Sequence, residues 1–391
     1  AHGSVLSNAA DISDADDFVR DRVEGARNCL IDLQRLCSYG HFRLSQHMML
    51  TRELLSGLGE AHSAYVTTLA LRREGIDARF VDLSGWRDER EMTLDERIRD
   101  GFADVDAAKE LPIVTGYAQC KEGLMAEFDR GYSEVTFSRI AALTGAREAI
   151  IHKEFHLSSA DPNLVEGEVH KLGHTNYDVA DQLSNMGMEA IHPKAAKTLR
   201  QADVPLRVTN AFEPHDPGTL IDDQPAKTPA AEIVTGLDVH ALELFEQDMV
   251  GVKGYDAKIL ELLTRHGLRI VSKTSNANTI THYVDAPLRD IRKVERDLNA
   301  VYPSAELTIQ PLAIASVIGR DLSGLKALAG GLKALAQADV DVISAHHTTR
   351  AVDVQYVVPR KALSQAISAL HGAFFENKGS SEQLPEARKA A

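Results

Sequence analysis

Apolar residues recur at helical spacing near the start of the chain. Between residues 14 and 38 they follow one another at steps of three and four, which predicts a helix with these residues on one face; they are Val19, Val23, Ala26, Leu30 and Leu33. The same kind of pattern predicts a second helix over residues 44–55 that ends at Ser56-Gly57. A third is predicted over residues 59–73, with Gly75 marking its end.

Short apolar runs then alternate with helical patterns. Strands are predicted at residues 78–83, 111–116, 148–151 and 206–208. Helices are predicted at residues 135–143, at residues 177–186 and after His192-Pro193, where proline takes its favoured first helical position. The charged stretch 86–109 has no clear period and is expected to hold a loop and a helix. The alternation over residues 60–221 predicts an α/β domain with a mainly parallel sheet.

The sequence repeats itself beyond a polar, proline-containing stretch at residues 222–231, which predicts a linker. At an offset of 72 residues a helix, a strand, a second strand and a second helix recur in the same order; the predicted pairs are 255–264 with 325–336, 268–272 with 340–344, 280–284 with 352–356, and 288–298 with 361–370. Two successive βαββαβ units predict a ferredoxin-like tandem over residues 232–375. Chance similarity is the alternative. Residues 376–391 are polar and predict a flexible tail.

Composition narrows the range of partners. The net charge of −14 argues against nucleic acid or an anionic membrane as the main partner. No apolar run approaches the roughly 20 residues of a membrane span. The three cysteines are odd in number and widely spread, which favours free thiols in a reducing, cytoplasmic compartment. We expect no metal site, because His152 and His156 are four apart but follow a strand rather than lie on a helix.

The stretch with the most chemistry is Phe128-Asp129-Arg130-Gly131-Tyr132-Ser133-Glu134, between a predicted strand and a predicted helix. A turn that opens a helix leaves backbone N–H groups free to bind an anion. Arg130 adds a planar set of donors suited to a carboxylate or phosphate. Taken alone, the stretch also fits an ordinary helix start with a surface arginine and a capping serine.

Several short segments resemble aspartokinase over residues from about 55 to 375. They are Gly59-Glu60-Ala61-His62-Ser63, Ile113-Val114-Thr115-Gly116, Arg130-Gly131-Tyr132-Ser133-Glu134, Ala160-Asp161-Pro162, Gly187-Met188-Glu189-Ala190-Ile191-His192-Pro193 and Pro217-Gly218-Thr219-Leu220-Ile221. The resemblance implies an amino-acid kinase fold over residues 1–221, followed by a tandem of ACT regulatory domains over residues 232–375.

The departures from the family pattern point to one branch. Tyr132 replaces a glycine, Glu134 an aspartate and Glu189 a lysine, while Ile151-His152-Lys153 stands where the family has Trp-Thr-Asp. These features resemble the aspartokinases associated with ectoine biosynthesis. The family's opening Lys-x-Gly-Gly-Thr strand does not occur in this sequence, so we expect the phosphate-binding part of the kinase domain to be incomplete at its N-terminus.

The resemblance implies ATP-dependent phosphorylation of L-aspartate to 4-phospho-L-aspartate, with Mg²⁺. Arg130 would bind a carboxylate of aspartate, Glu60 its ammonium group, and Ser133 with the Gly131 backbone would hydrogen-bond the substrate. Glu134 would orient the charged groups of the site. Without the resemblance, Glu60 fits equally well a carboxylate stabilised by a helix dipole.

Four residues are implied in nucleotide binding: His152, Lys153, Asp161 and Glu189. Lys153 ends a predicted strand, where α/β sheets bind ligands, and it could offset phosphate charge. A solvated lysine is the alternative. Asp161 most simply starts a turn before Pro162, and its nucleotide role is implied by the resemblance alone. His192 is expected to pack or cap a helix rather than to act in catalysis.

The resemblance also implies an amino-acid effector site in the first repeat and a homodimer formed through the ACT domains. The effector residues would be Lys253, Gly254, Tyr255, Thr274, Ser275 and Asn276. A purely structural dimer interface is the alternative. Two other functions stay open from the residues: a non-catalytic, amino-acid-binding regulatory subunit or truncated kinase, and a kinase for another amino acid on the same fold.

Overall fold

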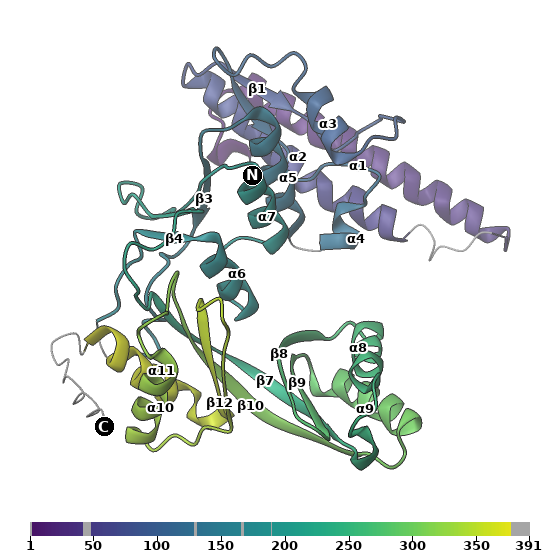
Figure 1. The fold of residues 1–391 in the computed structure, drawn as a ribbon. Helices are drawn as coiled ribbons and strands as arrows, with labels where there is room; N and C mark the ends of the chain where they lie inside the picture. Colours follow the sequence, from purple (N-terminus) through teal and green to yellow (C-terminus); the bar gives the residue numbers. More distant parts are fainter. Residues whose placement is uncertain (1, 42–47, 129–130, 166–167, 189, 377–391) are drawn as a thin grey trace, which may run out of the picture. The chain divides into compact units, whose positions relative to one another are not determined.

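A computed structural model describes residues 2–41, 48–128, 131–165, 168–188 and 190–376 of the chain. The chain forms two compact units (Figure 1). The first comprises Ala1–Ala149 and His192–Val204, and the second Ile150–Ile191 and Pro205–Ala391. The boundary between these units differs from the predicted domain boundaries, which divide the chain at residues 1–221, 222–231 and 232–375. Those domains stay a prediction drawn from sequence pattern and resemblance.

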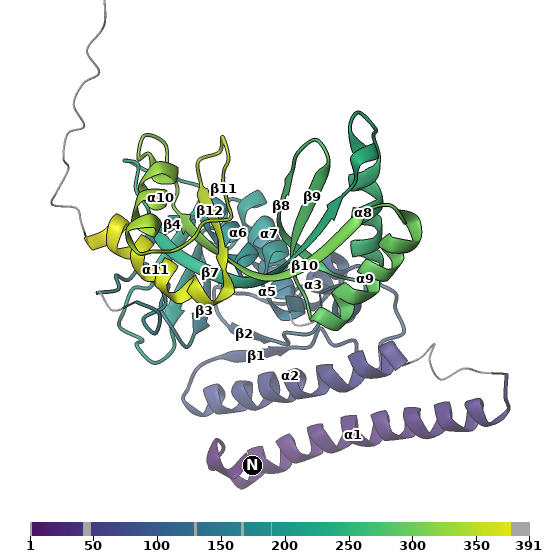
Figure 2. The same cartoon turned by 90° about the horizontal axis from the view of Figure 1, so that it is seen from below.

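The first unit begins with two long helices, α1 (Ala9–Ser38) and α2 (Met48–Arg73), which lie side by side (Figure 2). The predicted helix end at Ser56-Gly57 is wrong, because α2 runs unbroken through both residues. A Cβ on Gly57 would lie 2.6 Å from a ring carbon of Tyr117. This glycine therefore allows close packing on Tyr117 and does not end the helix. Residues 44–47 of the predicted second helix lie outside the described residues.

The rest of the first unit packs around a small parallel sheet. Strands β1 (Ala78–Val81) and β2 (Leu111–Val114) are parallel, with Ala78 opposite Leu111. The charged stretch contains α3 (Leu94–Gly101), which begins with a capping box between Thr93 and Glu96, as the loop-and-helix prediction allowed. The other helices are α4 (Leu124–Phe128), α5 (Tyr132–Thr144) and α7 (Pro193–Gln201). Helix α5 packs against α7, and His192 caps α7 as predicted.

The second unit holds a four-stranded sheet in the order β3-β5-β6-β4. Its strands are β3 (Ala149–Lys153), β4 (His174–Asn176), β5 (Leu206–Asn210) and β6 (Thr219–Asp222). Strands β4 and β6 are parallel, whereas β5 and β6 are antiparallel. Helix α6 (Tyr177–Asn185) follows β4 directly, because the Asn176 side chain accepts a hydrogen bond from the Val179 amide and starts the helix.

A six-stranded sheet in the order β11-β12-β10-β7-β9-β8 forms the rest of the second unit. Its strands are β7 (Ile233–Phe245), β8 (Arg269–Ser275), β9 (Thr279–Asp285), β10 (Glu306–Ile318), β11 (Ser344–His347) and β12 (Asp353–Pro359). Helices α8 (Tyr255–Arg265) and α9 (Leu288–Val301) lie at the end with β8 and β9 (Figure 1). Helices α10 (Ala327–Gln337) and α11 (Leu363–His371) lie at the end with β11 and β12.

This arrangement confirms the repeated unit and adds one feature. The first copy contributes α8, β8, β9 and α9, and the second copy contributes α10, β11, β12 and α11, with matching order. Strands β7 and β10 pair along all 13 residues of each and serve both copies.

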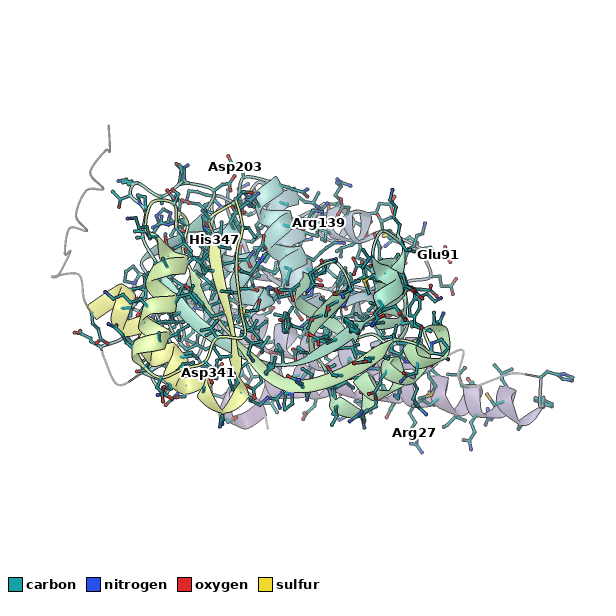
Figure 3. The ribbon with its side chains drawn as sticks, turned by 60° about the horizontal axis from the view of Figure 1, so that its bottom comes forward. Arg27, Glu91, Arg139, Asp203, Asp341 and His347 are labelled. Carbon is teal, nitrogen blue, oxygen red and sulfur yellow. The ribbon has the colours of Figure 1, made fainter. Side chains whose placement is uncertain are left out.

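One predicted boundary in the second copy needs correction. The strand predicted at residues 340–344 is wrong in extent, because β11 begins only at Ser344; Figure 3 labels Asp341 and His347 on either side of that start. Val340 is buried in the core of the second copy although its backbone is outside a strand. The apolar residues there therefore indicate burial and not strand pairing.

Short helical turns complete the described chain, at η1 (His2–Ser4), η4 (Gln247–Met249), η5 (Arg360–Ala362) and η6 (Gly372–Glu376). The predicted tail lies outside the described residues except for Glu376. None of the described helices is both long and apolar enough to cross a membrane.

Candidate active site

Glu60 on α2 and the first residues of α5 form a polar cluster in the first unit. Glu60 Oε1 accepts hydrogen bonds from the hydroxyl groups of Tyr132 and Ser133, both at 2.9 Å. Gly131 is the N-cap residue of α5 and has no side chain to cap the helix, so the reading of Ser133 as a capping residue is wrong. The structure thus brings two of the predicted substrate residues, Glu60 and Ser133, into direct contact.

The second carboxylate oxygen of Glu60, Oε2, differs from Oε1 in its hydrogen bonding. Oε2 is buried and has no hydrogen-bond partner among the described residues. Gly116, which follows β2, lies against it, and a Cβ at residue 116 would be 2.7 Å from Oε2. Glycine at this position leaves the carboxylate in place. Because an unpaired buried carboxylate oxygen is costly, this atom is a strong candidate to meet a donor group from a ligand.

Sequence reasoning missed the part that Tyr132 plays. Its hydroxyl holds Glu60, and burial together with the neighbouring carboxylate raises the pKa of Tyr132 to about 12. The Tyr132 ring also packs edge-on against Tyr117, with ring centroids 6.0 Å apart, and Tyr117 donates a hydrogen bond to Glu53. A signal was present in the sequence: Glu53, Gly57 and Glu60 share one face of α2 at spacings of four and three.

Glu134 and Gly131 fix the start of α5 against the start of α7. The carboxylate of Glu134 accepts a hydrogen bond from the backbone N–H of His192. A Cβ on Gly131 would lie 2.2 Å from a ring carbon of His192, so the two chain segments approach as closely as glycine permits. The structure therefore gives Glu134 a place in holding these helices. Arg130 and Glu189 lie outside the described residues, and their roles stay predictions.

The other predicted nucleotide residues lie in the second unit. His152 Nδ1 and the Thr209 hydroxyl are 2.8 Å apart, which ties β3 to β5. The backbone carbonyl of Lys153 accepts a hydrogen bond from the Ala211 amide. Asp161 accepts hydrogen bonds from the backbone and side chain of Asn163, at 2.8 and 3.0 Å. It therefore starts a turn, which was the simplest role predicted for it.

A charged cluster beside these residues was missed by sequence reasoning. The Lys171 ammonium group lies 2.9 Å from His156 Nε2, 2.9 Å from Glu213 and 3.1 Å from Asp216. Hydrogen bonds with the two carboxylates raise the pKa of Lys171, and those with Lys171 lower the pKa of Glu213. Atoms of His156, Glu213 and Asp216 lie close enough together to hold a cation, and the chain's own ammonium group occupies that position.

The predicted effector residues form two stretches of the first copy, Lys253-Gly254-Tyr255 before α8 and Thr274-Ser275-Asn276 at the end of β8. Gly254 has a φ of 107°, which few other residues adopt. Lys273 on β8 pairs with Asp256 in the first turn of α8 at 2.6 Å, so an ion pair joins the two elements that the prediction placed together. The buried His282 lies 3.3 Å from Asp256, and burial lowers its pKa.

The second copy has a cavity at the matching place. Its volume is about 450 Å³, and its wall includes Lys326 and Ala327 at the start of α10 and His347 at the end of β11. At the offset of 72 residues, Lys326 matches Gly254 and His347 matches Ser275. The prediction considered only the first copy, so it missed this cavity.

The sequence of the chain is similar to those of known kinases. Residues 22–210 match the model of the amino acid kinase family. The chain is 50% identical over 378 residues to aspartate kinase Ask_Ect of Stutzerimonas stutzeri, covering 96% of this chain and 79% of that protein. It is 23% identical over 413 residues to the chloroplastic aspartokinase 1 of Arabidopsis thaliana, covering 98% of this chain and 72% of that protein.

Two solved structures share the fold. Escherichia coli aspartokinase III, in complex with lysine and aspartate, matches with a TM-score of 0.72 at 18% identity, covering 92% of this chain and 82% of that one. Aspartate kinase from Clostridium acetobutylicum matches with a TM-score of 0.69 at 17% identity, covering 92% and 88%. At these identities the likeness concerns the fold.

Proposed function

Because the chain belongs to the aspartokinase family, we propose that it transfers the terminal phosphoryl group of ATP to the side-chain carboxylate of L-aspartate. An oxygen of that carboxylate forms a bond to the γ-phosphorus as the bond to the β,γ-bridging oxygen breaks. The products are 4-phospho-L-aspartate and ADP. The observation that carries the substrate assignment is the buried Oε2 of Glu60 beside Gly116, which has no hydrogen-bond partner within the described part of the chain.

Glu60 is suited to the ammonium group of aspartate. Tyr132 and Ser133 already donate to Oε1, so Oε2 is the atom left to accept a donor from the substrate. A charged acceptor strengthens such a hydrogen bond, most of all where water is excluded. Arg130, by its place in the sequence next to Gly131, would bind a carboxylate of the same molecule. Ser133 and the Gly131 backbone would add hydrogen bonds.

Phosphoryl transfer needs little covalent chemistry from the protein, because most of the catalytic effect comes from positioning and from neutralising phosphate charge. The hydrogen bond from His192 to Glu134 and the close approach of Gly131 to His192 would keep the start of α5 in one orientation. We assign His152, Lys153, Asp161 and Glu189 to the nucleotide. Lys153 is the last residue of β3. It would lie nearest the phosphates together with the carboxyl end of β5, because α/β sheets bind ligands at the carboxyl ends of their strands.

We assign Mg²⁺ to the incoming nucleotide. The donor set that could hold a resident ion, His156 with Glu213 and Asp216, already binds the Lys171 ammonium group. Its histidine also makes it a poor match for Mg²⁺, which prefers oxygen ligands and commonly arrives with phosphate groups. The substrate is therefore MgATP.

We further propose that the tandem of regulatory domains binds an amino-acid effector, that two chains pair through it, and that the product serves ectoine synthesis. The predicted effector residues are those of the first copy: Lys253, Gly254, Tyr255, Thr274, Ser275 and Asn276. The pathway assignment rests on the resemblance to one branch, in which the relative at 50% identity carries the name Ask_Ect.

The test is a steady-state assay of the protein expressed from its complete gene. ADP release is coupled to NADH oxidation, and acyl phosphate is trapped as the hydroxamate, with aspartate or glutamate as acceptor. We expect turnover that depends on aspartate and yields equal amounts of ADP and hydroxamate. A well-folded protein that binds amino acids but releases no ADP would instead be the regulatory subunit considered from the sequence. Turnover with glutamate in place of aspartate would reject the substrate assignment.

A further inference from the structure

The segment that contains Asp161 is built into the second copy of the repeat. Residues 157–165 and 168–172 fold against each other: the Ser159 amide donates to the His170 carbonyl at 2.8 Å, and the Leu172 amide donates to the Leu157 carbonyl at 2.8 Å. We call residues 157–165 and 168–172 together the folded-back segment. Its Ala160 and Val165 are buried in the same core as Ile367 and Leu370 of α11. All of these residues belong to the second unit.

One buried hydrogen bond joins this segment to the end of α11. Ser159 Oγ lies 2.9 Å from His371 Nε2, and both side chains are almost completely buried, at 1% and 0% exposure. The Ser159 carbonyl is also held, since it accepts the Val234 amide at 2.7 Å. The residues that meet here are 212 positions apart in the sequence.

The Ser159 hydroxyl connects His371 to a second part of the segment. Ser159 Oγ also accepts a hydrogen bond from the His170 amide at 3.0 Å. Because a serine hydroxyl can donate one hydrogen bond and accept two, its bond with His371 Nε2 can form in either direction. On the other side of the ring, His371 Nδ1 lies 3.5 Å from the Glu376 carboxylate. Burial lowers the pKa of His371, which favours the neutral imidazole.

We propose that His371 is a positioning residue for the nucleotide: through Ser159 it holds the segment that carries Asp161, so that the end of α11 sets nucleotide affinity. This inference rests on the proposed function, which assigns Asp161 to the nucleotide. His371 itself touches no substrate. Ser159 is two residues from Asp161, and the Asp161 side chain is engaged in its own turn, so a shift of Ser159 moves the whole turn.

Loss of the imidazole is the direct test. In His371→Leu the Ser159 hydroxyl keeps its proton but loses a buried partner, and a cost of this kind corresponds to about a tenfold weaker interaction. We expect KM for ATP, and Kd for a fluorescent ATP analogue measured by titration, to rise about tenfold. The values of kcat and of KM for aspartate should stay within about twofold. In His371→Gln the amide oxygen can accept from Ser159, and we expect nucleotide affinity to recover to within about threefold of the wild type.

Tyr356→Phe is the matched control. Tyr356 is buried in the same core, and its hydroxyl donates to the Ala327 carbonyl at 2.8 Å, away from the folded-back segment. This variant loses a buried hydrogen bond of the same kind, and we expect its nucleotide affinity to match the wild type. Equal losses in His371→Leu and Tyr356→Phe, or no recovery in His371→Gln, would show that His371 only stabilises the fold, and would overturn the proposal.

Ser159→Ala tests the same bond from the other side if His371→Leu does not fold. It removes this bond and also the acceptor of the His170 amide, so KM for ATP should rise at least as much as in His371→Leu. The double variant should be no worse than Ser159→Ala alone, because the bond to His371 is already lost there. Additive losses would overturn the proposal. If the wild type and the variants bind the fluorescent nucleotide equally well, the inference about His371 is refuted and the proposed function is not. A wild-type protein that binds no nucleotide refutes the proposed function as well.

Discussion

The Glu60 cluster and the folded-back segment around Asp161 are held by different kinds of structure. Glu60, Tyr132 and Ser133 come from two helices of one unit and hold one another through local hydrogen bonds. The folded-back segment shares its core with α11, which belongs to the repeated part of the chain. We therefore expect changes in the repeats to alter the affinity for the nucleotide and to leave the affinity for the amino acid unchanged.

The largest effect is expected from Glu60→Gln, which keeps the shape of the side chain and removes its charge. Affinity for aspartate should fall about a hundredfold, on the order of 3 kcal/mol, because a partly buried ammonium group loses its charged partner. Nucleotide affinity should stay unchanged, and initial rates at varied aspartate and ATP measure both. Glu53→Gln, on the same face of α2, is the control and should leave both values near those of the wild type. Weaker nucleotide binding in Glu60→Gln would break the comparison.

Gly131→Ala should disturb the amino-acid side next most strongly. Its Cβ would lie 2.2 Å from a ring carbon of His192, so α5 or α7 must move, at a cost of about 2 kcal/mol in stability. We expect KM for aspartate to rise and the thermal midpoint of the first unit to fall, as followed by calorimetry. Gly59→Ala is the matched control, because a Cβ there meets no atom within 4 Å; alanine should instead stabilise α2 by about 0.5–1 kcal/mol. The reverse order of stability would contradict this reading of Gly131.

Val165→Ala sharpens the other side of the comparison. It removes apolar contacts between the folded-back segment and α11, and we expect a loss of about 1–2 kcal/mol of stability together with a rise in KM for ATP. KM for aspartate should not change. Val294→Ala makes a similar deletion in the core of the first copy, where the folded-back segment does not reach, and should lower stability without weakening nucleotide binding. A matching rise in KM for ATP in both variants would mean that stability, not the shared core, controls affinity.

Tyr132→Phe should have the smallest effect. It removes one hydrogen bond to Glu60, worth about 1 kcal/mol, so KM for aspartate should rise about fivefold. The pKa of Tyr132 is raised to about 12 in the folded protein, above its unfolded value near 10, so its stabilising effect is present below pH 10. That contribution is lost as the pH rises from about 10 to about 12. Denaturant titrations at pH 9 and pH 11 should show a steeper loss for the wild type than for Tyr132→Phe, and equal losses would be inconsistent with this assignment.

Much of the fold could be read from the sequence because it depends on local periodicity. The first helix, the strands at Ala78 and Leu111 and the repeat at an offset of 72 residues were all visible as patterns of apolar residues. The errors arose where one residue type serves two purposes. Glycine often ends a helix, but Gly57 instead allows close contact with Tyr117. Val340 is apolar because it is buried, although it lies outside any strand.

The candidate site was predictable only in part for a related reason. Glu60 and Ser133 could be named from short motifs, yet the contact between them joins residues that are 73 positions apart. The bond between Ser159 and His371, and the gathering of Glu213 and Asp216 around Lys171, have no local pattern at all. Such contacts depend on how distant elements pack, and one sequence contains no periodic signal for them.

The long pairing of β7 with β10 has a mechanical consequence. Since each strand runs without interruption from one copy of the repeat into the other, neither copy has a backbone hinge of its own within the sheet. The two copies should therefore melt together as one cooperative block, with amide protons of β7 and β10 exchanging at a common, slow rate along their whole length. Deleting the first copy would remove the partner of β7 along His240–Phe245, and deleting the second would remove the partner of β10 along Leu312–Ile318, so either deletion exposes one edge of the shared pair of strands.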